Sequence, residues 1–310
     1  MRTAFIQTLT EVARKNSNVM LLTGDLGYSV FESFAAEMPS QFLNCGVAEQ
    51  NMMGVAAGLA KAGKKPFVYS IIPFVTLRCL EQIRNDFCYH LLGVTIVGVG
   101  AGYSYGALGA THHAIEDLAI TRAIPDLTVV APGDPMEVSA AVYALASHPK
   151  PAYLRLGKRG DPLVHTTPIN DFRLGFGLVL RAGTNIALVS TSTMLPTAIA
   201  VADQLAQQKN ISATVVSMHT LKPLDAKLIE KLASEHRRIY TLEEHSIIGG
   251  LGSAVCEMVA YLPQPKARVI RLGIPDVFQH RAGSQEHYRK LVGLDPDSII
   301  KRILAEGNDL

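Results

Sequence analysis

Cysteine and charge are both scarce in this sequence, and each scarcity excludes a class of protein. The four cysteines form no CxxC pair and stand at no His-Cys spacing suited to zinc, so we expect neither a disulfide framework nor a metal ligand in this chain. Charged residues make up 18% of the chain, and the formal net charge is +2, with no long run of one sign. Nucleic acid is therefore not an expected partner.

Long apolar runs are also missing. No run approaches the roughly 20 residues that span a bilayer, and the first residues show no basic region followed by an apolar stretch. We therefore expect a soluble protein that makes no membrane contact. Because no disulfide pattern is present, we expect it in a reducing cytoplasm.

The apolar residues that are present suffice for a large core. A chain of 310 residues with 48% apolar residues can support two α/β domains, and this composition is typical of sheets covered by helices on both faces. In the first half, short apolar runs that indicate buried strands alternate with stretches of helical spacing. We expect strands at residues 19–22, 67–72, 94–99 and 127–130, and helices at 51–61, 77–89, 115–122 and 136–147. This order predicts a mostly parallel sheet.

A second, smaller α/β domain is expected after a linker. Residues 157–171 are rich in Gly, Pro, Thr and Asp and lack periodicity, as linkers do. The alternation then resumes, with strands expected at 186–189, 213–217, 239–242 and 269–271, and helices at 195–208, 225–234 and 252–261. We place the first domain at residues 1–160, the linker at 161–176 and the second domain at 177–310.

The most specific motif is GVAEQN at residues 46–51, followed by the small-residue string GVAAGLA at residues 54–60. A glutamate at the start of a helix is favoured by the helix dipole, but the dipole alone does not explain the whole string. The string resembles the element with which the transketolase family of thiamine diphosphate enzymes presents its activating glutamate. The resemblance implies that Glu49 donates a proton to N1′ of the cofactor's aminopyrimidine, while the thiazolium acts as electron sink.

The resemblance continues through residues 66–86. Phe74 takes the position of the aromatic residue that packs on the aminopyrimidine, and Ile71 and Leu77 stand where family members often have further aromatics. The resemblance therefore implies that Phe74 and Ile71 contact the cofactor.

A glycine-rich loop at residues 98–117 carries the sequence Thr111-His112-His113. His112 matches the family's histidine that faces the reacting carbon centre, so the resemblance implies a catalytic and substrate-binding role for it. His113 is a further candidate for substrate contact. The alternative is that both histidines only stabilise the start of the next helix.

The same loop departs from sugar-phosphate transketolases. Gly100 and Leu108 stand where those enzymes have a histidine and an aspartate that contact the substrate. Losing two polar contacts weighs heavily on specificity, so the identity of the donor or acceptor is in doubt. Tyr103 and Tyr105 are candidate replacement contacts.

An anion clamp is expected at the far end of the substrate. Arg2 and Ser29 match family positions that hold the anionic end of the substrate. The family has a further arginine of this kind near the positions that Arg155, Lys158 and Arg159 take in this sequence. Guanidinium groups suit phosphate or sulfonate oxygens. The competing interpretation is that these are ordinary surface charges.

The Gly-Asp-Gly stretch and following asparagine, with which family members hold the diphosphate through a metal, are absent from the sequence. The resemblance otherwise covers essentially the whole chain, including residues 217–225 and 243–253, and implies a pyrimidine-binding domain followed by the family's C-terminal domain. It therefore implies that Mg²⁺ and the diphosphate bind to an N-terminal transketolase-like partner subunit, in an α2β2 heterotetramer.

The expected activity is ketol transfer from an unusual ketose to an aldehyde. The ketose is expected to carry an anionic tail, and a phosphate, a sulfonate and a nucleotide's diphosphate all remain open. Two other activities remain open within the same chemistry: the second subunit of a 2-oxo acid decarboxylating dehydrogenase component, and a deoxyxylulose-phosphate-synthase-like enzyme. A non-catalytic scaffold subunit is the third alternative.

Overall fold

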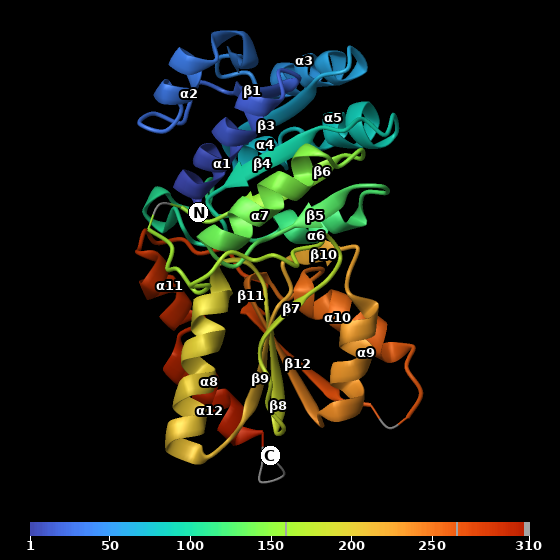
Figure 1. The fold of residues 1–310 in the computed structure, drawn as a ribbon. Coiled ribbons are helices and arrows are strands. Elements are labelled where there is room, and N and C mark those ends of the chain that lie inside the picture. The colour runs from blue at the N-terminus through green and yellow to red at the C-terminus, as the bar shows by residue number, and fades with distance from the viewer. Residues whose placement is uncertain (159, 265, 307–310) are drawn as a thin grey trace.

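The computed structural model describes residues 1–158, 160–264 and 266–306, which form two α/β domains (Figure 1). The first domain is built on a seven-stranded sheet. In spatial order, its strands are β10 (Thr220–Lys222), β5 (Thr128–Val130), β6 (Ala152–Leu156), β4 (Thr95–Val99), β3 (Lys65–Ile71), β1 (Val19–Thr23) and β2 (Phe42–Asn44). All pairs are parallel except β10 with β5.

Helices cover both faces of this sheet, as its fully buried central strands require. One buried cluster contains side chains of α1 (Arg2–Lys15), α2 (Glu32–Glu37) and α7 (Pro135–Ala146). The other contains side chains of α3 (Glu49–Lys61) and α6 (Asp117–Ala123). The expected α/β fold with a mostly parallel sheet is confirmed.

The second domain is a five-stranded sheet between two pairs of helices. Its strands lie in the order β12 (Arg268–Ile274), β11 (Arg238–Ser246), β8 (Ile186–Ser190), β9 (Ala213–Ser217) and β7 (Leu178–Arg181). Figure 1 shows α8 (Leu195–Lys209) and α12 (Pro296–Ala305) on one face, and α9 (Ala226–Glu235) and α10 (Leu251–Ala260) on the other. The short helix α11 (Gln285–Leu291) follows β12 and its loop. Among the described residues, no helix is long and apolar enough to cross a membrane.

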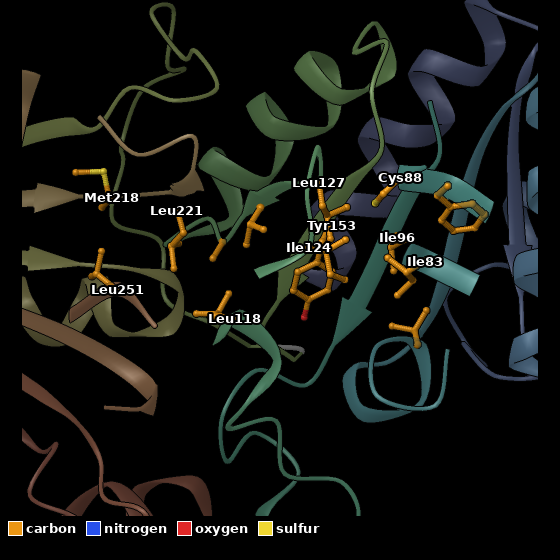
Figure 2. Close-up of a cluster of buried hydrophobic side chains, with 14 of the residues drawn as sticks. Ile83, Cys88, Ile96, Leu118, Ile124, Leu127, Tyr153, Met218, Leu221 and Leu251 are labelled. Carbon is orange, nitrogen blue, oxygen red and sulfur yellow. The ribbon is translucent and has the colours of Figure 1, made fainter. Parts of the chain in front are cut away.

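The two domains share strands and core. β10 comes from the second half of the chain but pairs with β5 of the first sheet. One apolar cluster includes Tyr153 and Leu118 from the first half and Met218 and Leu251 from the second, as Figure 2 shows. The sequence did not predict this exchange, because β10 is only three residues long and its partner is distant in the chain.

The helix expected at residues 77–89 is interrupted. The chain instead forms α4 (Ile72–Val75), α5 (Leu80–Gln82) and the π-helical turn η2 (Ile83–Cys88). Thr76 lies between α4 and α5, and its hydroxyl donates to the carbonyl oxygen of Ile72 at 2.6 Å. Residues 76–79, which include Arg78, thus lie between two short helices and not in one regular helix.

A buried arginine ties the first sheet to the second domain. Arg155 on β6 has no exposed surface. Its Nε and Nη2 donate to the two carboxylate oxygens of Asp117 at 2.8 and 3.1 Å. Nη2 also donates to the carbonyl oxygens of Ala114 and Glu244, and Nη1 donates to Ser192 Oγ. The prediction that Arg155 belongs to a substrate clamp is therefore wrong, because these internal acceptors engage the whole guanidinium.

Replacing Arg155 should destabilise the chain strongly. In Arg155→Met the Asp117 carboxylate would stay buried without its cation, and we expect a loss of about 3–5 kcal/mol in the free energy of unfolding. Urea denaturation of the purified chain measures this loss. The control is Lys150→Met, whose exposed pair with Asp126 at 2.9 Å should contribute less than about 1 kcal/mol. Equal stability of the two variants would contradict the assignment.

Candidate active site

Glu49 begins α3 and is almost entirely buried, with 3% of the residue exposed. The turn after β1 packs directly on it, since a Cβ at Gly24 would lie 3.5 Å from Glu49 Cγ. Its carboxylate accepts a hydrogen bond from Arg78 Nη1 at 2.8 Å. Its place in the first turn also favours negative charge through the helix dipole. Glu49 is therefore a buried carboxylate with a charged partner.

Arg78 joins Glu49 to two other predicted site residues. Its guanidinium carbon lies 4.5 Å from the centroid of the Phe74 ring. The His112 ring also meets Phe74, with the two centroids 5.1 Å apart at an interplanar angle of 69°. The structure thus brings Glu49, Phe74 and His112, which are far apart in the sequence, into one row through Arg78.

Arg78 was not among the site residues predicted from the sequence. A usable signal was present, because Arg78 follows Phe74 by four residues and would share its face on a regular helix. The backbone there is irregular, but the two side chains still meet. The side chain of Gln50, next to Glu49, donates to the carbonyl oxygen of Arg78 at 3.0 Å and so fixes its backbone.

Ile71 ends β3 and Phe74 lies in α4, so both are at the carboxyl edge of the first sheet. Both side chains are half-buried, and Ile71 packs against the apolar cluster on the α1 side. Leu77 is 44% exposed. The geometry therefore places Phe74 against Arg78, the partner of Glu49, whereas cofactor contact by Phe74 and Ile71 stays a prediction.

The two histidines of the loop point in different directions. His112 is half-buried, its Nδ1 is 2.9 Å from Thr111 Oγ1, and it faces Phe74. His113 is buried, and its Nε2 donates to the carbonyl oxygen of Gly106 at 3.3 Å. Burial lowers the pKa of both imidazoles, so each favours the neutral form.

His113 packs inside the loop against the second domain. Its ring meets the rings of Tyr103 and Tyr288 edge-on, at 5.1 and 5.3 Å. Tyr103 stacks on Tyr288 and has no exposed surface. The prediction that Tyr103 contacts substrate is therefore corrected, because its ring supports the loop from inside. A substrate contact by His113 stays a prediction.

The start of this loop is held by a carboxylate of the second domain. Glu244 is fully buried and accepts the backbone N–H of Tyr103 at 2.8 Å. Gly102 makes this approach possible, since a Cβ there would lie 2.5 Å from Glu244 Cγ and its φ is +59°. Gln285 and Arg289 also donate to the Glu244 carboxylate. The loop that carries His112 is thus positioned by the second domain.

Arg2 and Ser29 line one groove of about 700 Å³ between α1 and α2. Arg2 also lies beside Tyr105: burial raises the pKa of this phenol, and the guanidinium opposes the shift. The Tyr105 ring covers Gly100, where an added Cβ would lie 2.4 Å from it. Tyr105 therefore fills the space that a side chain at position 100 would need.

Lys158, another basic residue predicted for the clamp, is separate from this groove. Lys158 is half-buried beside Glu286 and does not line the groove of Arg2 and Ser29. Arg159 lies outside the described residues. The structure therefore brings together Arg2 and Ser29 but leaves Lys158 apart from them.

Within the described residues, three metal-capable side chains also gather at the linker. Ligand atoms of Asp134, Glu137 and His165 lie within 4.8 Å of one another. Asp134 caps α7 by accepting the N–H of Glu137, and it accepts the N–H groups of Val164 and His165 at 2.9 and 2.8 Å. These hydrogen bonds fix the linker to the first domain.

Comparisons with known proteins agree with this geometry. Residues 1–160 match the family described as "Transketolase, pyrimidine binding domain", and residues 175–299 match "Transketolase, C-terminal domain". The chain is 39% identical to a subunit of an apulose-4-phosphate transketolase from Phocaeicola vulgatus, covering 98% of this chain and 96% of the relative. It is 36% identical to a 6-deoxy-6-sulfo-D-fructose transketolase subunit from Clostridium sp., covering 97% and 92%.

A solved structure described as a split gene transketolase, inactive beta4 tetramer, superposes with a TM-score of 0.89 at 36% identity. The match covers 98% of this chain and 97% of that chain. A 1-deoxy-D-xylulose-5-phosphate synthase from Azoarcus sp. is 35% identical, but the match spans only 47% of its length. The match thus spans nearly the full length of the two transketolase subunits and of the split gene transketolase chain, but only about half of the synthase.

Proposed function

This chain belongs to the transketolase family, and we propose that it is the small subunit of a split enzyme that transfers a two-carbon ketol unit from a ketose to an aldehyde with thiamine diphosphate. The observation that carries the proposal is the row of Glu49, Phe74 and His112 at the carboxyl edge of the first sheet. Ligand sites of open α/β sheets lie at this edge. The likeness to two transketolase subunits over nearly their full length supports the same proposal.

The residues present fit the aminopyrimidine of thiamine diphosphate. A buried carboxylate and an aromatic ring already engage one planar hydrogen-bond donor, the Arg78 guanidinium. The aminopyrimidine would meet the same two groups, because its planar ring can pack on Phe74 and its N1′ would donate to the Glu49 carboxylate once it holds the proton that the two share. When bound, thiamine diphosphate supplies the carbanion chemistry and the electron sink.

Each residue of the row has a distinct role. With the cofactor bound, Glu49 would share a proton with N1′ of the aminopyrimidine, and its burial would exclude water from that contact. Phe74 would support the ring by packing. His112, favoured in its neutral form, can donate or accept a proton at the reacting carbonyl oxygen.

The second half of the site must come from a partner. The sequence contains no Gly-Asp-Gly stretch followed by an asparagine, so we place the Mg²⁺ and diphosphate ligands on an N-terminal transketolase-like subunit. The names of two relatives, which call each of them a transketolase subunit, support a split enzyme. We expect an α2β2 heterotetramer located in the cytoplasm.

The alternatives are less well supported. The deoxyxylulose-phosphate synthase relative matches over about half of its length, whereas the transketolase subunits match over nearly all of theirs. A pyruvate decarboxylation assay with an artificial electron acceptor separates ketol transfer from 2-oxo acid chemistry. A scaffold has no need for Glu49, because burying a carboxylate costs desolvation energy.

The donor substrate is expected to carry an anionic tail but to differ from ordinary sugar phosphates. Arg2 and Ser29 share a groove, which supports an anion site for a phosphate or sulfonate. Gly100 leaves room for Tyr105, which we propose as the replacement for a histidine contact. Two relatives are named for apulose 4-phosphate and 6-deoxy-6-sulfo-D-fructose, and these names support an unusual sugar with a phosphate or sulfo group.

Turnover should require reconstitution. We expect the isolated chain to bind thiamine diphosphate weakly and to show no ketol transfer, with both restored by the diphosphate-binding subunit and Mg²⁺. Calorimetry and a coupled transketolase assay measure the two quantities. Micromolar, metal-dependent cofactor binding by the isolated chain would disprove the division of the site.

Glu49→Gln should retain fold and assembly but lower turnover by about 10²- to 10⁴-fold, because an amide cannot share a proton with N1′. Cofactor affinity should fall less than the rate. Hydrogen–deuterium exchange at C2 of the bound cofactor is the direct measurement. An unchanged exchange rate in the variant would refute the role of Glu49.

Xylulose 5-phosphate should be a poor donor. The polar residues missing at Gly100 and Leu108 would each leave a substrate group without its partner, so we expect its kcat/KM to be about ten- to a hundredfold below that of the best donor. A donor screen with the reconstituted pair measures this ratio.

A pair of variants sharpens the donor screen. Tyr105→Phe should reduce kcat/KM for the best donor, whereas Tyr261→Phe, at a tyrosine of the second domain that is 91% exposed, should not. If xylulose 5-phosphate is the best donor, or if Tyr105→Phe acts like the control, the interpretation of Gly100 and Tyr105 is wrong.

A further inference from the structure

The Arg78 side chain makes the two contacts that the aminopyrimidine is expected to make. It donates to the Glu49 carboxylate at 2.8 Å, and its guanidinium carbon lies 4.5 Å from the centroid of Phe74. A guanidinium is planar, carries several N–H donors and stacks on aromatic rings. We propose that Arg78 occupies the aminopyrimidine position in the cofactor-free chain and leaves when thiamine diphosphate binds. The inference rests on the proposed function, which supplies the cofactor.

The exposure of the two partners indicates which one moves. The Glu49 side chain is 4% exposed, whereas the Arg78 side chain is 45% exposed. A half-exposed arginine can turn into solvent through rotation of its own side-chain bonds, and a buried carboxylate in a packed helix start cannot. Arg78 is therefore the removable part of the pair.

The backbone of Arg78 is held while its side chain is free to turn. Its N–H donates to the carbonyl oxygen of Pro73 at 3.2 Å, and its carbonyl oxygen accepts from Gln50 Nε2 at 3.0 Å. Displacement thus needs no rearrangement of α3 or of the segment between α4 and α5. Because these hydrogen bonds keep the Arg78 backbone in place, the guanidinium can pair with Glu49 again when the cofactor leaves.

This exchange explains why the buried Glu49 carboxylate does not destabilise the cofactor-free chain. A buried carboxylate without a partner is destabilising, and Arg78 supplies the partner before the cofactor does. Arg78 and thiamine diphosphate therefore compete for Glu49. Because the cofactor must first break the ion pair between Arg78 and Glu49, its apparent affinity is reduced. The partner subunit then completes a site that this chain alone keeps closed.

The first experiment tests the ion pair in the isolated chain. Urea denaturation is compared for wild type, Arg78→Ala, Glu49→Gln and the double variant. Arg78→Ala should raise the unfolding equilibrium constant about tenfold or more, and it should have little effect in the Glu49→Gln background. Arg84→Ala is the control, since Arg84 is on the same segment and its Nη1 makes an exposed hydrogen bond to Asn85 at 2.7 Å.

The second experiment measures thiamine diphosphate binding to the reconstituted pair by calorimetry. Removing the competitor should tighten binding in Arg78→Ala about three- to thirtyfold, with Arg84→Ala unchanged. Unchanged or weaker binding in Arg78→Ala would overturn the proposal, and weaker binding would make Arg78 a cofactor ligand instead. Equal destabilisation by Arg78→Ala in both backgrounds would overturn it as well.

These measurements do not depend on turnover. If the wild-type pair shows no ketol transfer with any donor, the proposed function fails while the binding and stability data still decide the role of Arg78. If the pair is active and the affinity does not rise, only the inference fails. Should Arg78→Ala not fold, Arg78→Gln, which removes the cation but keeps a polar side chain, takes its place in both experiments with the same expected results.

Discussion

The carboxylate of Glu49 is almost entirely enclosed by protein, and a charge in that position is stable only beside an opposite charge or a hydrogen-bond donor. This constraint accounts for the arrangement around it. Arg78 supplies the donor in the cofactor-free chain, and Phe74 supports the flat group that does so. Under the proposed function, the aminopyrimidine would meet the same two groups: its flat ring would pack on Phe74, and the proton shared between N1′ and Glu49 would take the place of the arginine N–H.

The second domain contributes none of the side chains in the row of Glu49, Phe74 and His112, yet that row depends on it. Glu244 holds the start of the loop through the N–H of Tyr103, and only a glycine at 102 lets the two come so close. Arg155, on β6 of the first sheet, donates to the backbone carbonyl oxygen of Glu244 and so joins that residue to the first domain. The domain interface therefore helps to hold His112 beside Phe74, which is the rigid support that the proposed role of this loop would require.

Local patterns predicted most of the fold, because the strands and helices follow from chain periodicity. Glu49 and Phe74 were proposed from the resemblance of the GVAEQN string and of the segment after it to the transketolase family, and the structure brings both against Arg78. Arg155, Tyr103 and Arg78 were misplaced or missed. Their roles depend on contacts between segments far apart in sequence, such as Arg155 with Glu244, and on the break in the expected helix at residues 77–89. Neither has a signature in hydrophobic spacing.

The substitutions at the substrate end are better understood as an exchange than as a loss. A side chain at position 100 and the Tyr105 ring exclude each other, since the Cβ alone would lie 2.4 Å from the ring. Glycine at 100 therefore accompanies the tyrosine, and Arg2 beside that phenol keeps a cation in the groove shared with Ser29. Under the proposed function, the remaining cation would keep the recognition of an anionic tail, while a phenol in place of an imidazole would remove a group that can carry positive charge. The change would then alter which hydroxyls and tail geometries are accepted without removing the requirement for an anion.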